Sequence, residues 1–290
     1  MKNKVFHGDN LAVLKSIPDE SIDLIYVDPP FNTGVTQTRE LKKMTKNANG
    51  SVKGFKGETY NVKNIGSYSY SDSYYDFLDF LKPRLVEAKR VLSKKGTLYV
   101  HLDYREVHYV KVFLDELFGR NNFLNELIWA YDYGGKAKKR WPTKHDTILV
   151  YVKDIKKYHF SNVDVDREPY MAPGLVTEEK AKRGKLPTDV WWYTIVSPTG
   201  KEKTGYPTQK PLGILKRIIS ASSKEGETVL DFFAGSGTTG EAAAALKRNF
   251  ILVDENADAV LVIRKRFAAR MPELDVEYID ATHKKVKSKK

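Results

Sequence analysis

The sequence predicts an α/β fold in which a mostly parallel sheet is covered by helices on both faces. Three observations lead to this prediction. Short apolar segments alternate with helical patterns through most of the 290 residues, as in folds built from successive strand and helix units. Glycines and capping residues mark the ends of several helical patterns. The hydrophobic content of 41% and the charged content of 30% are those of a globular chain with a sizeable core.

The predicted strands are short apolar runs bounded by turn residues. They cover residues 4–6, 23–27, 97–102, 127–131, 147–152, 228–231 and 250–254. Helices are predicted between them, over residues 72–92, 103–118, 211–222, 238–247 and 257–270. Gly96 and Gly119 are expected to stop the first two helices and Asn256 to cap the last, because glycine and asparagine favour such positions.

Two regions interrupt this alternation. Residues 33–71 are rich in Lys, Asn, Gly, Ser and Tyr without any period, which predicts a long mobile loop inserted after a strand. Residues 155–205 contain several prolines and two adjacent tryptophans, which predicts an irregular, partly folded insertion. Residues 283–290 are mostly lysine and are expected to form a disordered basic tail.

The net charge of +12 favours a polyanion as partner, with freely solvated lysines as the alternative interpretation. The excess is concentrated in two stretches. Residues 35–66 hold seven basic and two acidic residues, and residues 134–160 hold eight basic and two acidic residues. A nucleic-acid groove uses such residues for phosphate contacts and base stacking. The candidate DNA-binding residues in the second stretch are Lys136, Lys138, Lys139, Arg140, Trp141 and Lys144.

Several classes of protein are excluded by what the sequence lacks. There is no cysteine, so disulfide frameworks, thiolate zinc sites, iron–sulfur clusters and cysteine nucleophiles are excluded. The first residues contain no apolar run, and no eighteen uncharged apolar residues follow one another anywhere. We therefore expect a cytoplasmic protein that is neither secreted nor embedded in a membrane. We also expect no metal site.

A glycine-rich turn follows the strand at 228–231. Gly235, Gly237 and Gly240 satisfy a dinucleotide fingerprint, and Asp254 ends the next strand, where an acid can bind ribose hydroxyls. This predicts an adenosine-containing cofactor. A nicotinamide dehydrogenase is an alternative, but too few residues follow Gly240 for the second half of a dinucleotide-binding fold. The turn is not a P-loop, because no Gly-Lys-Ser/Thr follows it.

The tetrapeptide Asp28-Pro29-Pro30-Phe31 follows the predicted strand at 23–27. Ligands of parallel sheets bind beyond the carboxyl ends of the strands, so these residues are well placed for chemistry. The Asp28 carboxylate and the Pro29 carbonyl, fixed by the two proline rings, can accept both hydrogens of an exocyclic amine. Phe31 can stack on a base. The alternative is a turn that merely ends a strand.

Taken in order, these pieces resemble the β class of DNA amino-methyltransferases, which transfer a methyl group from S-adenosylmethionine to adenine N6 or cytosine N4. Other segments extend the resemblance over nearly the whole chain: Gly8-Asp9, residues 22–31, Gly134-Gly135 with Lys144-His145-Asp146, residues 206–211 and residues 231–239. The presence of Trp191 before the motif at 206–211 makes the sequence most similar to the modification subunits of type III systems. Phe31 departs from the more frequent tyrosine, which removes a hydroxyl group but keeps the stacking face.

The resemblance implies a Rossmann-like, S-adenosylmethionine-dependent methyltransferase fold that is circularly permuted. Residues 1–154 would form the catalytic half, 155–205 a target-recognition insertion and 206–282 the cofactor-binding half. Asp9 would contact the cofactor adenine, Asp254 its ribose, and Thr208 and Lys210 its carboxylate, towards which the helix start at Thr238 would point. The other implied cofactor-binding residues are Asp231, Phe233, Ala234, Gly235, Ser236 and Gly237.

The target is expected to be adenine, because an aspartate at the head of the tetrapeptide is more usual for adenine in this family. Cytosine N4 stays open as an alternative. Cytosine C5 is excluded, since its methylation needs a thiolate nucleophile. A catalytically silent DNA-binding protein on the same fold is the rival from another class. Double-stranded DNA is the expected partner, with the target base flipped out of the duplex. A homodimer and a companion restriction enzyme are both left open.

Overall fold

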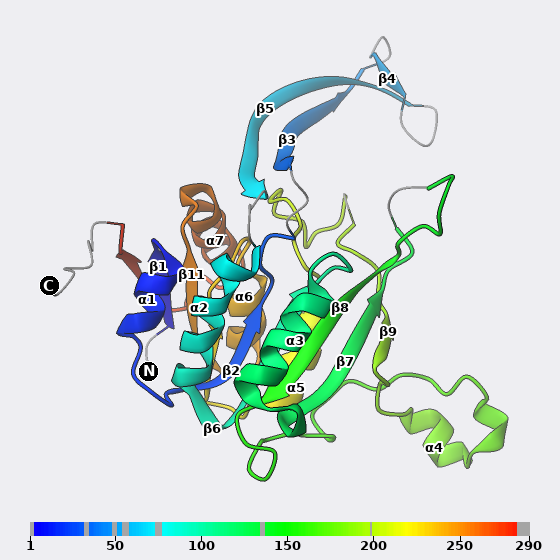
Figure 1. Ribbon diagram of the computed structural model, residues 1–290. Coiled ribbons are helices and arrows are strands. Elements are labelled where there is room, and N and C mark those ends of the chain that lie inside the picture. The colour runs from blue at the N-terminus through cyan, green and yellow to red at the C-terminus, as the bar shows by residue number, and fades with distance from the viewer. Residues whose placement is uncertain are drawn as a thin grey trace, which may run out of the picture.

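The computed structural model describes residues 3–31, 35–47, 51–53, 58–72, 77–133, 137–197 and 199–282, so the predicted basic tail at 283–290 lies outside the described residues. In these ranges nine strands form one sheet in the order β12-β1-β11-β10-β2-β6-β8-β7-β9 (Figure 1). β8 runs against both of its neighbours and the other pairings are parallel, which confirms the predicted sheet. The strands are β1 (Asn3–His7), β2 (Ile22–Val27), β6 (Leu92–Leu102), β7 (Phe123–Ala130), β8 (His145–Val152), β9 (Val190–Trp192), β10 (Thr228–Asp231), β11 (Asn249–Asp254) and β12 (Val276–Asp280).

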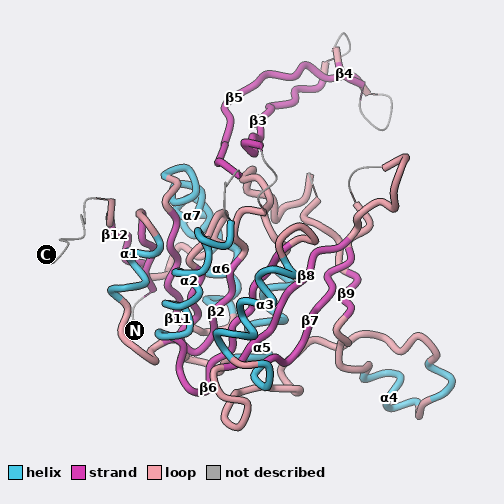
Figure 2. The backbone as a smooth tube through the Cα atoms, viewed as in Figure 1, coloured by secondary structure: helices cyan, strands magenta, loops and turns pink. Residues whose placement is uncertain are grey.

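Helices cover both faces of the sheet, as predicted (Figure 2). One apolar cluster joins α1, α2 and α3 to one face, and a second joins α5, α6 and α7 to the other. The sheet is therefore buried on both sides, which explains why its central strands are continuous apolar runs. The helices are α1 (Asn10–Ser16), α2 (Phe77–Val91), α3 (Val107–Phe118), α5 (Leu212–Ser222), α6 (Thr238–Ala245) and α7 (Ala257–Arg270).

The ends of these helices follow local chemistry. α3 ends at Gly119, whose φ of 86° is readily adopted by glycine. α7 begins after Asn256, whose side chain accepts a hydrogen bond from the Asp258 amide at 2.8 Å. Both ends are as predicted. Gly96 does not stop a helix, contrary to the prediction, because α2 ends at Val91 and Gly96 lies within β6. The short helix α1 and the strand β12 were not expected from the pattern.

The prediction of an irregular loop at 33–71 is wrong. β3 (Val35–Lys46) and β5 (Thr59–Asp72) form a long antiparallel hairpin, and the short β4 (Val52–Lys53) joins it. Its register runs from the Val35–Asp72 pair to the Lys46–Tyr60 pair. The many threonines, tyrosines and valines favour strands, although no apolar face marks the segment. The hairpin extends from the edge at which β2 ends (Figure 1).

The segment at 155–205 is irregular for most of its length and contains the short α4 (Glu178–Arg183) and the 3₁₀ turn η2 (Pro173–Leu175). The other 3₁₀ turn of the described residues, η1 (Arg120–Asn122), lies between α3 and β7. The last part of the segment is not separate from the core, because β9 extends the central sheet by pairing Trp191 with Trp129 of β7. Arg217 of α5 anchors the segment through ion pairs with Asp166 at 2.6 Å and Glu168 at 2.9 Å.

The two halves of the chain meet where β10 pairs with β2. The pairs are Val229 with Leu24 and Leu230 with Ile25, and both pairings are parallel. The carboxyl ends of the two strands therefore lie side by side, although one comes early and the other late in the chain. This connection confirms the permuted order and brings the tetrapeptide next to the glycine turn.

Candidate active site

A cavity of about 250 Å³ opens at the carboxyl ends of β2 and β10. Most of the predicted site residues line it. From the tetrapeptide these are Asp28, Pro29, Pro30 and Phe31, and from the cofactor set they are Thr208, Lys210, Asp231, Phe233, Ala234, Gly235, Ser236, Thr238 and Asp254. The fold thus brings together residues that lie as much as 226 positions apart, from Asp28 to Asp254.

The Asp28 carboxylate is held by Lys210, whose ammonium group donates to Oδ2. The two side chains are only 17% and 10% exposed, so this ion pair is largely shielded from water. Asp28 Oδ1 is buried and has no hydrogen-bond partner among the described residues. Buried carboxylate oxygens are normally satisfied, so this oxygen is an acceptor left for a ligand. Lys210 thus has a partner other than the cofactor carboxylate that the sequence suggested.

Phe31 lies near a cation and a buried imidazole. The Lys210 ammonium is 5.0 Å from the centre of the Phe31 ring. On the inner side, the ring of His101 is centred 5.9 Å from that of Phe31. His101 contacts Tyr26 at 2.8 Å and Asp146 at 3.2 Å. Sequence reasoning gave no role to these three residues, although Asp146 is the one acid in the apolar run of β8.

Two acids, the buried Asp231 and the partly buried Asp254, shape the glycine turn. Asp231 accepts from the Phe233 amide at 3.0 Å and from the Thr239 hydroxyl at 2.5 Å. Asp254 accepts from the Gly235 amide at 2.8 Å. Burial raises the pKa of Asp231 to about 7 and that of Asp254 to about 6. The turn is therefore fixed by hydrogen bonds from its own amides and hydroxyls before any ligand binds.

Two predicted cofactor residues, Gly237 and Asp9, do not line the cavity. A Cβ atom at Gly237 would lie 2.8 Å from Ile263 Cγ1, and φ is +76°. This glycine is required by packing against α7 and by its backbone conformation. Asp9 caps α1 by accepting from the Ala12 amide at 2.8 Å and pairs with Arg84 at 3.1 Å. Its neighbour Asn10 lines the cavity instead, and adenine contact by Asp9 stays a prediction.

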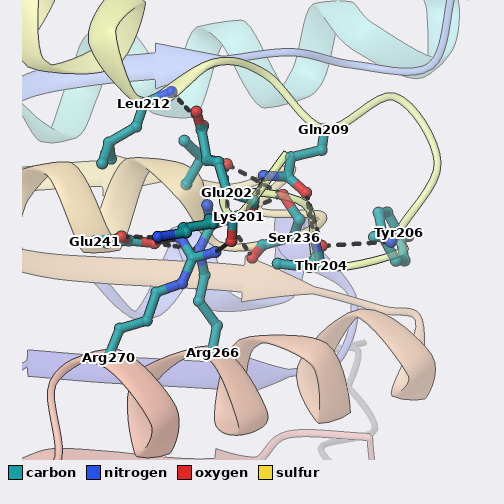
Figure 3. Close-up of polar contacts among 11 residues, drawn as sticks. Lys201, Glu202, Thr204, Tyr206, Gln209, Leu212, Ser236, Glu241, Arg266 and Arg270 are labelled. Atoms are coloured by element: carbon teal, nitrogen blue, oxygen red, sulfur yellow. Dashed lines mark hydrogen bonds and ion pairs between the residues drawn. The ribbon is translucent and has the colours of Figure 1, made fainter. Parts of the chain in front are cut away.

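The segment that carries Thr208 and Lys210 is secured by a polar network (Figure 3). Gln209 accepts from the Thr204 amide at 2.9 Å and donates to the Glu202 carbonyl at 2.8 Å. Arg270 of α7 donates to the Lys201 carbonyl at 2.9 Å. These contacts hold the segment against the cofactor half of the chain. Tyr206 of the same segment lies over the glycine turn, since a Cβ atom built on Gly235 would be 3.4 Å from the Tyr206 ring.

The centre of this network is a fully buried arginine. Arg266 pairs with Glu241 of α6 and donates to the Ser236 carbonyl at 2.9 Å and the Thr238 hydroxyl at 2.8 Å (Figure 3). Arg270 pairs with the same glutamate at 2.9 Å. A buried guanidinium needs such partners because it cannot be deprotonated at ordinary pH. The glycine turn is therefore tied to α7 through one charged residue.

We expect Asp231→Asn to stabilise the fold increasingly as the pH rises from 5 to 8. The folded-state pKa of Asp231 is about 7, above the ordinary value of about 3.9. The folded state therefore binds more protons than the unfolded state between about pH 4 and 7, so the wild type loses stability as the pH rises, by up to ~1.4 kcal/mol per unit. Urea unfolding of both proteins at pH 5 and 8 measures the effect, and a difference independent of pH would contradict it.

The predicted DNA-binding residues follow β7, whose carboxyl end lies at the same edge of the sheet as Asp28. Lys138, Lys139, Arg140 and Trp141 are exposed, and Lys144 is partly buried. Lys136 and the pair Gly134-Gly135 lie outside the described residues. Trp141 is 93% exposed, which is unusual for so large an apolar side chain.

A free acceptor oxygen beside a turn suited to an adenosine cofactor places this fold among the S-adenosylmethionine-dependent amino-methyltransferases. The chain belongs to the DNA methylase family, whose model matches residues 22–265. DNA adenine methyltransferase YhdJ of Escherichia coli (strain K12) is 34% identical over 264 residues, 88% of this chain and 79% of that protein. Type II methyltransferase M.HpaI of Haemophilus parainfluenzae is 29% identical over 266 residues, 92% and 74% of the two chains.

Solved structures share the fold. TTHA0409 from Thermus thermophilus, complexed with S-adenosyl-L-methionine, has a TM-score of 0.60 at 21% identity and covers 97% of this chain and 99% of its own. The PvuII DNA methyltransferase (cytosine-N4-specific) has a TM-score of 0.62 at 15% identity, with coverages of 96% and 95%. The protein is thus a DNA methyltransferase of the β class, and S-adenosylmethionine is its cofactor. No helix in the described part of the chain is long and apolar enough to cross a membrane.

Proposed function

We propose that this protein methylates N6 of adenine in double-stranded DNA. The observation that carries the proposal is the buried Oδ1 atom of Asp28, which lines the cavity without a hydrogen-bond partner in the described ranges. A carboxylate oxygen accepts one hydrogen of an exocyclic amine, and the Pro29 carbonyl would accept the other. Two acceptors draw the nitrogen lone pair out of conjugation and leave it free to react.

The choice of adenine rests on two further points. The tetrapeptide begins with aspartate, and a relative 34% identical to this chain is named a DNA adenine methyltransferase. The fold itself does not discriminate, since a cytosine-N4-specific enzyme has a TM-score of 0.62. An intact Asp28 with a free acceptor also favours catalysis over the rival interpretation of a silent DNA-binding protein.

The residues of the cavity fit the cofactor. S-adenosylmethionine supplies a methyl group on a positively charged sulfur. Phe233, Ala234, Gly235 and Ser236 would hold its methionine part, and Asp254 would bind its ribose, as the lining of the cavity allows. Phe31 would stack on the flipped base, and its ring is held in place by contact with that of His101.

The target base is tested by expressing the protein in a methylation-free host and analysing the released nucleosides by chromatography. N6-methyladenine is the expected product, and sequencing of the modified bases gives the recognition site. N4-methylcytosine would overturn the choice of adenine but keep the mechanism.

The sequence left open whether the protein acts as a homodimer. Gel filtration with and without a duplex of the recognition site measures its oligomeric state.

We expect replacement of Lys138, Lys139 and Arg140 by alanine to weaken DNA binding and reduce its salt dependence. For every phosphate that is no longer neutralised, the slope of log K against log salt should fall by about 0.9. The three residues are exposed on the loop after β7. Fluorescence anisotropy at several salt concentrations measures the slope. The matched control is replacement of Lys94 and Lys95, which are exposed at the start of β6, at the edge of the sheet opposite Asp28. If neither variant changed the slope, the three residues would be solvated surface charges.

A further inference from the structure

A buried polar chain lies directly behind the tetrapeptide. It consists of Tyr26, His101, Asp146 and Tyr131, which come from β2, β6, the start of β8 and the residue after β7. Tyr26 Oη is 2.8 Å from His101 Nδ1, His101 Nε2 is 3.2 Å from Asp146 Oδ2, and Tyr131 Oη donates to Asp146 Oδ1 at 3.2 Å. We call these four residues the Asp146 chain.

The hydrogen bonds define the protonation of His101. A carboxylate accepts, so Nε2 must donate to Asp146. Burial raises the pKa of Tyr26 well above its ordinary value, so its hydroxyl keeps its proton. That proton needs an acceptor, and His101 Nδ1 is the partner that the described residues provide. His101 is therefore neutral, with its hydrogen on Nε2, and Asp146 is the charged member of the chain.

Asp146 is ionised and acts on the site through Lys210. Burial would raise the pKa of Asp146, but the hydrogen bonds that it accepts from His101 and Tyr131, together with the charge of Lys210, hold that pKa below its ordinary value. Lys210 in turn is paired with Asp28. The ammonium thus lies within the field of two carboxylates, Asp28 in contact with it and Asp146 next to His101.

Asp146 changes the balance of charge beside Asp28, in a cavity that Arg84, Asp231 and Asp254 also line. Asp28 contributes −1 and Lys210 contributes +1, so these two cancel each other. Asp146 adds −1 next to this pair. In a poorly hydrated site the field of one unpaired charge extends over several ångströms, because it is weakly screened.

We propose that Asp146 is a positioning residue that adds negative charge beside the target amine, where the charges of Lys210 and Asp28 cancel each other. This inference rests on the proposed function. As the amine nitrogen bonds to the methyl carbon, the bond from that carbon to sulfur breaks and the electron pair stays on sulfur. The positive charge passes to the nitrogen, which then releases a proton to solvent. Negative charge beside the amine favours that transfer of charge in the transition state.

Asp146→Asn tests the charge and leaves the shape unchanged. The amide can still accept from His101 Nε2 and can donate to the Tyr131 hydroxyl. We expect kcat to fall about 10- to 100-fold, with the KM for S-adenosylmethionine and the Kd for DNA within about threefold of wild type, because Asp146 does not line the cavity. Circular dichroism and thermal melting check that the variant folds.

Asp115→Asn is the matched control. Asp115 is also a poorly exposed carboxylate, which accepts from the Tyr151 hydroxyl at 2.7 Å and pairs with Lys111 at 2.7 Å. It lies in α3 and does not line the cavity. Its kcat should equal that of the wild type. A similar loss of kcat in both variants would indicate a general structural effect and overturn the proposal.

A second measurement needs no methyl donor. Duplexes of the recognition site would carry at the target position either 1-methyladenine, which is cationic at neutral pH, or its neutral analogue 1-methylhypoxanthine. Wild type should prefer the cation, and Asp146→Asn should lose about 10- to 100-fold of this preference. An unchanged preference, or an unchanged kcat, would overturn the role of Asp146. Absence of methyl transfer by the wild type would instead refute the proposed function.

Discussion

Replacing Asp28 with asparagine is expected to lower kcat for methyl transfer by about 10²- to 10³-fold, the cost of removing one well-placed polar group from a transition state. Lys210 has three N–H donors and no acceptor, so the amide oxygen of the new side chain would turn towards it. The amide NH₂ group would then face the target amine. The free acceptor at Oδ1 is lost while the shape of the side chain is kept.

Binding should separate from catalysis in this variant. Calorimetric affinity for S-adenosylmethionine and anisotropy with duplex DNA should stay close to wild type, since the glycine turn and the basic loop are unchanged. Incorporation of tritiated methyl groups into DNA measures the rate. Incorporation at the wild-type rate would remove Asp28 from the reaction.

The second large effect is on stability. Glu241→Gln is expected to lower the free energy of unfolding by about 3 kcal/mol, because it leaves a buried arginine charge without its counter-ion. Arg266 is fully buried, and Arg270 shares the same carboxylate. The affinity for S-adenosylmethionine should fall as well, since Arg266 also holds the Ser236 carbonyl and the Thr238 hydroxyl of the glycine turn. Urea unfolding and calorimetry measure the two effects.

An exposed ion pair in the same half of the chain is the control. Glu225 pairs with Lys247 at 3.4 Å, and their side chains are 64% and 76% exposed. Glu225→Gln should change the free energy of unfolding by less than ~1 kcal/mol. If Glu241→Gln were no more destabilising than this control, the buried network would not stabilise the turn.

The catalytic tetrapeptide and the glycine turn were predictable because both are local. Each follows a short apolar strand, and the parallel sheet brings the ends of β2 and β10 together. Gly237 shows the limit of this reasoning, because its neighbour Ile263 comes from a helix that local sequence cannot place against it. The Asp146 chain was missed for the same reason: its four members come from different segments, and each alone is only a polar residue near an apolar run.

The long hairpin was missed for another reason. Predicting strands from alternation needs one buried face, and the sequence from Val35 to Asp72 has no such apolar face. β-branched and aromatic residues were the remaining signal, and lysine, asparagine and glycine obscured it. β9 was missed as well, because its three residues lie in a proline-rich stretch and their pairing with β7 is a long-range contact.

The position of β1 has a consequence for how the protein is made. β1 lies between β11 and β12, and its Lys4 pairs with Ile251 and with Glu277. A ribosome adding roughly 5–20 residues per second needs about 12 to 50 s to reach Ile251 after Lys4, during which β1 has no partner strand. The sheet therefore closes late in biosynthesis, and the cofactor site with it.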